Sequence, residues 1–230
     1  MGYDETALPD VSALTVGILG GTGPQGRGLA YRLARAGQPL RIGSRAAERG
    51  GQAAADLAAM PGVPDGVVTG GDNRYACAAD VVIVAVPFDG HAALLEELSD
   101  ALAGRIVVDC VNPLGFDAQG PHSLRVPEGS AAQQAARLLP GSRVCAAFHL
   151  VSAPLLADPS VERIDLDVLV LSEDRDAALV VQALAARIPG MRGVYAGRLR
   201  NAGQVEALTA NLIAINRRYK VHAGIRVTDL

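Results

Sequence analysis

The stretch TVGILGGTGPQG, residues 15–26, places a glycine-rich turn directly after a short apolar segment. We expect Thr15–Leu19 to form a buried strand and a helix to follow over residues 25–36. In this GxGxxG pattern Gly21 would allow the tight turn, Gly23 would let the backbone approach a pyrophosphate, and Gly26 would let the helix pack closely on the strand. The helix N-terminus would offer free N–H groups to phosphate. Glycine-rich turns are common in a chain with 26 glycines, but this one stands between the first strand and the first helix and therefore predicts a dinucleotide site.

Short apolar strands and helical segments alternate along the rest of the chain. The clearest strand is Val81–Val86, whose unbroken apolar run indicates burial on both faces, as in a parallel sheet. The alternation predicts an α/β protein with a doubly wound parallel sheet of the Rossmann type. After residue 150 the rhythm changes, so we expect a nucleotide-binding domain over 1–150 and a small, mainly helical domain over 151–230. The other expected strands are 40–42, 67–69, 106–109, 143–147 and 167–171, and the other expected helices are 46–59, 91–102, 131–139, 174–187 and 201–219.

The end of the second expected strand decides which nucleotide the turn would serve. Enzymes that use NAD usually carry Asp or Glu there, which hydrogen-bonds the ribose 2′-hydroxyl. This chain has Ser44 and Arg45 instead, with Arg49 one helical turn later. A carboxylate would repel a 2′-phosphate, whereas a hydroxyl and two guanidinium groups would bind it, so these residues favour NADP. The alternative is that Ser44 only caps the second helix and that both arginines are solvated; capping and phosphate binding do not exclude each other.

Three further segments follow strands at the same expected edge of the sheet. Pro87 follows the strand at Val86, Asn112 follows Ile106–Asp109, and His149 follows the strand at residues 143–147. Pro87 could simply end its strand, and a structural histidine is as good an interpretation of His149 as a contact with nicotinamide. The loop over residues 112–129 is long and rich in Gly and Pro, which makes it a candidate for function. The chain has no Ser-His-Asp order, no HExxH and no Tyr-x-x-x-Lys, so we expect no catalytic nucleophile or general base and no metal site.

Composition and charge exclude several classes of protein. Half of the residues are hydrophobic and 20% are charged, which is enough to bury a core and excludes a disordered chain. The net charge of −3 and the 3% of aromatic residues argue against binding of nucleic acid. No apolar run approaches the length of a membrane span. Cys77, Cys110 and Cys145 are far apart, so we expect no disulfide framework, no zinc site and a reducing cytoplasm. Cys110 and Cys145 have no basic residue beside them, so we expect both to be small core residues.

The N-terminal residues carry little information. We expect residues 1–14 to be irregular and frayed, and we find no signal peptide. Met1–Thr6 match a loose myristoylation pattern, but the acidic residues among them favour an ordinary terminus.

Several of these runs together resemble one family of enzymes. They are GILGGTGPQGRGLAYRLARAG (17–37), IGSRAAER (42–49), VVIVAVPF (81–88), VVDCVNPLGFDAQGP (107–121), AAFHLVSA (146–153) and the C-terminal stretch from Gly190. Nearly the whole chain from Thr15 on resembles the NADPH-dependent reductases of the deazaflavin coenzyme F420, and the C-terminal stretch is similar to their actinobacterial members. The resemblance implies a Rossmann domain, a small C-terminal domain and a dimer.

The resemblance also implies roles for individual residues. Thr22, Gly23, Pro24 and Gln25 match the family's pyrophosphate turn, and Ser44, Arg45 and Arg49 match its 2′-phosphate clamp. Positions on the nicotinamide side match Val86, Gly90 and Ala147, and a deazaflavin contact matches Ala223. Some relatives have Trp where this chain has Phe88, which leaves a ring-stacking role there open.

The expected function is hydride transfer between NADP(H) and coenzyme F420 in the cytoplasm, by a homodimer or higher homo-oligomer. Hydride would pass directly between two stacked rings, which explains why no acid–base machinery is found. The alternatives are an NADPH-dependent flavin or ferric reductase, a weaker imine or hydroxy-acid reductase, and a sensor that binds NADP(H) without catalysis. The helix over 201–219 is expected to contribute to a dimer interface, with packing inside one chain as the alternative.

Overall fold

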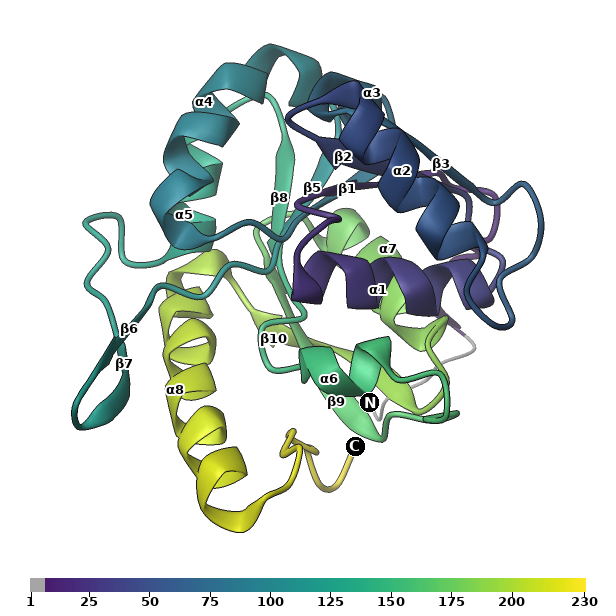
Figure 1. The fold of residues 1–230 in the computed structure, drawn as a ribbon. Coiled ribbons are helices and arrows are strands. Elements are labelled where there is room, and N and C mark those ends of the chain that lie inside the picture. Colours follow the sequence, from purple (N-terminus) through teal and green to yellow (C-terminus); the bar gives the residue numbers. More distant parts are fainter. Residues whose placement is uncertain (1–6) are drawn as a thin grey trace.

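Unbroken apolar runs build the centre of the sheet. The computed structural model describes residues 7–230, in which every residue of β1 (Val16–Leu19), β4 (Val81–Val84) and β5 (Ile106–Asp109) is buried. A strand buried on both faces needs a layer of helices on each side, and Figure 1 shows helices on both faces of the sheet. The other strands of this sheet are β2 (Leu40–Ser44), β3 (Val68–Asp72), β8 (Arg143–Ala146), β9 (Leu166–Ser172) and β10 (Met191–Gly197).

The eight strands lie in the order β10-β9-β8-β5-β4-β1-β2-β3. Neighbouring pairs are parallel except β8 and β9, which are antiparallel. The strand order reverses between β1 and β4, so the loops that leave these two strands diverge and open a crevice at their carboxyl ends. The doubly wound α/β fold is confirmed, and the crevice is the place where such a sheet binds ligands.

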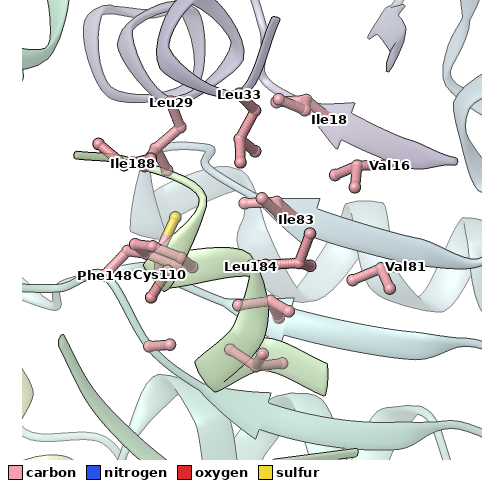
Figure 2. Packing of buried hydrophobic residues seen from close by; sticks show 14 of the residues in the cluster. Val16, Ile18, Leu29, Leu33, Val81, Ile83, Cys110, Phe148, Leu184 and Ile188 are labelled. Carbon is pink, nitrogen blue, oxygen red and sulfur yellow. The ribbon is translucent and has the colours of Figure 1, made fainter. Parts of the chain in front are cut away.

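Two helical layers cover the sheet. Leu29 and Leu33 of α1 and Leu184 of α7 point toward sheet residues such as Ile18 and Ile83 on one face (Figure 2). Helices α4, α5 and α8 supply the core on the other face. The helices are α1 (Pro24–Arg35), α2 (Ala47–Ala58), α3 (Asn73–Cys77), α4 (His91–Leu102), α5 (Ala131–Leu138), α6 (Ala153–Ala157), α7 (Arg175–Ala186) and α8 (Ala202–Tyr219).

The three cysteines belong to these cores. All of them are free and buried, and burial raises the pKa of Cys77 and of Cys145 to about 11. Burial raises the pKa of Cys110 as well. A thiol with a raised pKa is a poor nucleophile, so the prediction that Cys110 and Cys145 are small core residues is confirmed.

The turn between β1 and α1 depends on close backbone contact. Gly20 has φ +84°, in the left-handed region that favours glycine. A Cβ added at Gly26 would lie 2.4 Å from the carbonyl oxygen of Gly20, so only glycine allows α1 to begin this close to the strand. The predicted role of Gly26 is confirmed. The left-handed residue of the turn is Gly20 rather than Gly21, because the chain reverses one residue earlier than the GxGxxG pattern suggests.

The chain after residue 150 adds to the same sheet. Strands β9 and β10 extend it beyond β8, while α6, α7 and α8 make this region mainly helical. The first half of α8 is core, since Val205 and Leu212 are buried, whereas Ile215 and Tyr219 near its end are exposed. Packing inside the chain therefore accounts for only part of the apolar stripe of this helix. The division into two domains at residue 150 stays a prediction.

The bounds of most predicted helices and strands agree with the structure to within about two residues. The structure also contains several short elements that the sequence did not predict. The loop over residues 112–129 contains a hairpin of β6 (Leu114–Asp117) and β7 (Gly120–Ser123), which lies beside α8 (Figure 1). This hairpin, β10, α3 and α6 were not predicted, because each is short or rich in Gly and Pro. No helix of the described residues is both long and apolar enough to cross a membrane.

The N-terminal segment differs from the expectation. Residues 1–6, with the loose myristoylation pattern, lie outside the described residues. From residue 7 to residue 14 the chain is irregular, as expected, but Val11 is buried and its carbonyl accepts a hydrogen bond from Gln38 Nε2 at 2.8 Å. The expected fraying is therefore wrong for these residues, because the segment packs on the core beside α1.

Candidate active site

A cavity of about 880 Å³ occupies the crevice between β1 and β4, and we call it the β1–β4 cavity. Its floor is the turn after β1, and its walls are the ends of β2, β3 and β4 and the first turns of α4. Eight of the predicted site residues line it: Thr22, Gly23, Ser44, Arg45, Arg49, Val86, Pro87 and Gly90. The structure thus brings Thr22 and Gly23 of the predicted pyrophosphate turn and all three residues of the predicted 2′-phosphate clamp to one cavity.

Two helix N-termini at this edge lack side-chain caps. Gly23 stands at the N-cap of α1 and Ala46 at the N-cap of α2, and neither makes a side-chain capping hydrogen bond. The alternative role of Ser44 as the cap of α2 is therefore wrong. Uncapped helix N-termini present N–H groups and partial positive charge to anions. With the exposed side chains of Arg45 and Arg49 beside α2, this arrangement fits a ligand with phosphate groups at two separate points.

Sequence reasoning missed the wall that follows β3. Asp72, Asn73 and Arg74 line the same cavity, together with Glu97 of α4. Asp72 caps α3 by accepting a hydrogen bond from the Tyr75 N–H, and Arg74 pairs with Asp100 at 3.0 Å. The signal was present, because Gly70 and Gly71 followed by Asp72 and Asn73 is a turn sequence at the end of an expected strand.

A second cavity of about 510 Å³ adjoins the first turn of α1, and we call it the α8 cavity. It is enclosed by Gln25, by the ends of β5 and β8, by α6, by α8 and by the segment that follows α8. Four predicted site residues line it: Gln25, Asn112, His149 and Ala223. Gln25 is only two residues from Gly23 of the β1–β4 cavity, so both cavities reach the start of α1.

The chain turns sharply after β8, directly before His149 of the α8 cavity. Phe148 is buried and has φ +62°, a left-handed conformation that is strained for a bulky residue. Its carbonyl accepts a hydrogen bond from Gln25 Nε2 at 3.3 Å. The next carbonyl, of His149, accepts from Asn112 Nδ2 at 3.0 Å and from Thr209 Oγ1 at 3.2 Å. Side chains from α1, from the loop after β5 and from α8 therefore hold this turn in place.

The imidazole of His149 is buried in the wall of the α8 cavity. Beside it, Oδ1 of Asn112 has no hydrogen-bond partner among the described residues. Burial lowers the pKa of His149 to about 4, so the ring is neutral near pH 7.

A buried charged cluster supports both cavities from behind. His91 Nε2 and Asp109 Oδ2 lie 2.6 Å apart, both fully buried, and Asp109 Oδ1 accepts the Val111 N–H at 3.0 Å. Burial opposes the charged form of His91, but the hydrogen bond and charge of Asp109 raise its pKa. Glu206 of α8 accepts the N–H groups of Ala131 and Ala132 at the start of α5, and burial raises its pKa to about 7.

This cluster fixes the two loops that carry site residues. His91 begins α4 directly after Pro87 and Gly90, and Asp109 holds the backbone just before Asn112. Sequence reasoning missed His91 and Glu206, because a polar residue on a helix is normally read as exposed. Nothing in the local pattern distinguishes them from surface positions.

Four predicted residues line neither cavity. Gly21, Pro24 and Gly26 belong to the turn and to the first turn of α1, where they shape the backbone. Ala147 is fully buried, and its N–H donates to the carbonyl of Asp109 at 3.0 Å, so its side chain does not reach a cavity. Contacts of these four residues with a cofactor stay predictions.

Comparison with known proteins identifies the family. Residues 15–113 match the family model described as NADP oxidoreductase coenzyme F420-dependent. The F420-dependent NADP reductase of Methanothermobacter thermautotrophicus is 40% identical over 96% of this chain and 97% of its own length. The chain belongs to the F420-dependent NADP reductase family.

Two further relatives agree with this assignment. The family member from Methanocaldococcus jannaschii is 35% identical over 94% of this chain and 99% of its own length. A solved structure from Arthrobacter sp. FB24, provisionally described as an F420-dependent NADP reductase, has a TM-score of 0.78 at 26% identity. It covers 94% of this chain and 100% of its own.

Proposed function

We propose that this protein transfers a hydride between NADP(H) and the deazaflavin coenzyme F420. The observation that carries the proposal is that two cavities of different character both reach the start of α1. One has the groups that bind phosphate, and the other is flanked by apolar and polar residues that suit a flat ring. Family membership supports the same activity.

The β1–β4 cavity would hold NADP(H). The N–H groups at the start of α1 would bind the pyrophosphate, and Gly23 leaves the backbone open to it. Ser44, Arg45 and Arg49 would bind the 2′-phosphate at the start of α2. Strand β2 ends in Ser44 and not in an acidic residue, so no carboxylate at this position would repel the phosphate. Val86 and Pro87 would place the nicotinamide toward the start of α1 and hence toward the second cavity.

The α8 cavity would hold the deazaflavin. Arg217 and Lys220 line it, and no Asp or Glu among the described residues does, which suits the anionic polyglutamate tail of the coenzyme. Ala223 leaves room for a flat ring to approach the segment after α8. The neutral imidazole of His149 and the amide of Asn112 would orient polar edges of the two rings.

The proposed chemistry needs position rather than acid–base groups. When both coenzymes are bound, a hydride passes between their rings, which must lie roughly 3–3.5 Å apart. The residues between the cavities would hold this geometry, because Phe148 and His149 are fixed by Gln25, Asn112 and Thr209. His149 would orient or polarise a ring and would not supply a proton, since its pKa is about 4.

A comparison of electron acceptors separates the proposed function from its alternatives. Purified protein is mixed with NADPH, and the absorbance of the reduced nicotinamide is followed with coenzyme F420, FMN or ferric citrate as acceptor. We expect rapid oxidation with F420 and little with the other two. Oxidation mainly with FMN or ferric ion would make the protein a flavin or ferric reductase, and binding of NADPH without oxidation by any acceptor would make it a sensor.

Removal of Arg45 tests the phosphate clamp. We expect Arg45→Ala to lower kcat/KM for NADPH by about 10–150-fold, because one charge-assisted contact contributes about 1.5–3 kcal/mol, and to leave NADH nearly unaffected. Arg143→Ala is the matched control, since Arg143 is exposed at the amino-terminal end of β8, whereas the clamp lies at the carboxyl ends of the strands. Equal use of NADH and NADPH by the unmodified protein would contradict the clamp.

We also propose that the protein acts as a cytoplasmic homodimer. Three buried free thiols suit a reducing compartment. Phe116 of the hairpin and Ile215 and Tyr219 of α8 are exposed on neighbouring elements, as at an interface core. Light scattering at micromolar concentration should give twice the chain mass; the mass of one chain would contradict the dimer.

A further inference from the structure

The last residues of the chain return to the sheet and close one side of the α8 cavity. After α8, Lys220 takes a left-handed conformation (φ 56°) and turns the chain back. We call residues 221–227 the C-terminal strap; it runs back toward α6 and β9 (Figure 1), and Val221, His222 and Ala223 line the cavity. Apart from these contacts the strap is largely exposed, so its position depends on how it is tied.

Asp167 of β9 is the main tie. Its side chain is fully buried and accepts hydrogen bonds from Arg192 Nε and Nη2, both at 2.7 Å, in a bidentate pair. The same carboxylate accepts from Arg226 Nη1 at 3.0 Å and from the Val227 N–H at 2.7 Å. The Asp167 N–H donates to the carbonyl of Ile225 at 2.9 Å, so the strap is tied through both backbone and side chain.

Weaker contacts hold the other end of the strap. The Ala223 N–H donates to Asn216 Oδ1 of α8 at 2.6 Å, and Ser152 Oγ lies 3.0 Å from His222 Nδ1. Gly224 packs on Leu166, the residue before Asp167. Arg226 makes a second ion pair with Asp165 at 2.8 Å.

The burial of Asp167 makes this tie stronger than a surface ion pair. Exposed ion pairs contribute little, because water screens them and ordering two long side chains costs entropy. The buried carboxylate of Asp167 accepts four hydrogen bonds, two of them from the strap. If the strap moved away, the charged carboxylate would stay buried with only the two hydrogen bonds from Arg192. Burial alone would raise the pKa of Asp167, but the hydrogen bonds from Arg192 and Val227 outweigh it and keep the pKa low.

We propose that Asp167 and Arg226 are positioning residues, which hold the C-terminal strap against the α8 cavity and thereby set the affinity for the second substrate. The inference rests on the proposed function, because it assigns the α8 cavity to the deazaflavin. Neither residue lines the β1–β4 cavity or the α8 cavity, so both would act on these cavities only through the strap.

Arg226→Gln is the principal test, because Arg226 is partly exposed and Asp167 keeps Arg192 when it is lost. We expect hydrogen exchange of the strap amides to become faster and KM for coenzyme F420 to rise about tenfold, since one charge-assisted tie is lost. KM for NADPH and kcat should stay within about twofold, because the β1–β4 cavity and the ring geometry of the bound complex are unchanged. Asp167→Asn should show the same pattern more strongly.

Arg198→Gln is the matched control. Arg198 makes an exposed ion pair with Glu173 at 3.5 Å, shares no partner with Arg226 and lines neither cavity, so neither exchange nor KM should change. Unchanged exchange in Arg226→Gln and Asp167→Asn would show that these residues do not hold the strap. Faster exchange with an unchanged KM for F420 would show that the strap does not set the affinity. A wild-type protein that neither binds nor reduces F420 would overturn the proposed function itself, which the strap variants cannot mimic.

Discussion

Close backbone packing at the end of β1 is the constraint on which the rest of the site depends. The Gly20 carbonyl accepts the Gly23 N–H at 2.9 Å and lies where any Cβ at Gly26 would collide with it. Because of this contact, α1 begins directly above its strand, and its uncapped N-terminus faces the crevice between β1 and β4. The same placement lets Gln25 reach the carbonyl of Phe148 and so connects the start of α1 to the turn after β8, beside the α8 cavity.

Buried polar groups hold the loops around this centre. The pair of His91 and Asp109 supports the loops after β4 and β5, and Glu206 connects α8 to the start of α5. On the other face, Arg32 of α1 is buried and donates to the carbonyls of Leu155, Leu156, Asp158 and Val161, which fixes α6 beside the α8 cavity. A rigid support of this kind suits a reaction that depends on the distance and orientation of two rings.

Local pattern predicted much of this molecule, and long-range contacts explain what it missed. The strands at Val16 and Val81, the turn at Gly23 and the arginines after β2 follow from apolar runs, glycine spacing and charge, all of which are local signals. The buried roles of His91, Glu206 and Asp167 depend on partners 18 to 75 residues away, so no local pattern could reveal them. Strand β10 was missed because the sequence around Gly193 and Gly197 is a poor strand former, and pairing with β9 decides its conformation.

Direct transfer between two rings held by adjoining cavities is the central claim, and isotope transfer tests it most directly. NADPH deuterated at the transferred C4 position is mixed with the protein and oxidised coenzyme F420 in ordinary water, and the reduced deazaflavin is examined by mass spectrometry and NMR. We predict that the deuterium is found at C5 of the deazaflavin, because a hydride that passes from carbon to carbon does not exchange with solvent. Reduced deazaflavin that carries only solvent hydrogen at C5 would contradict the account.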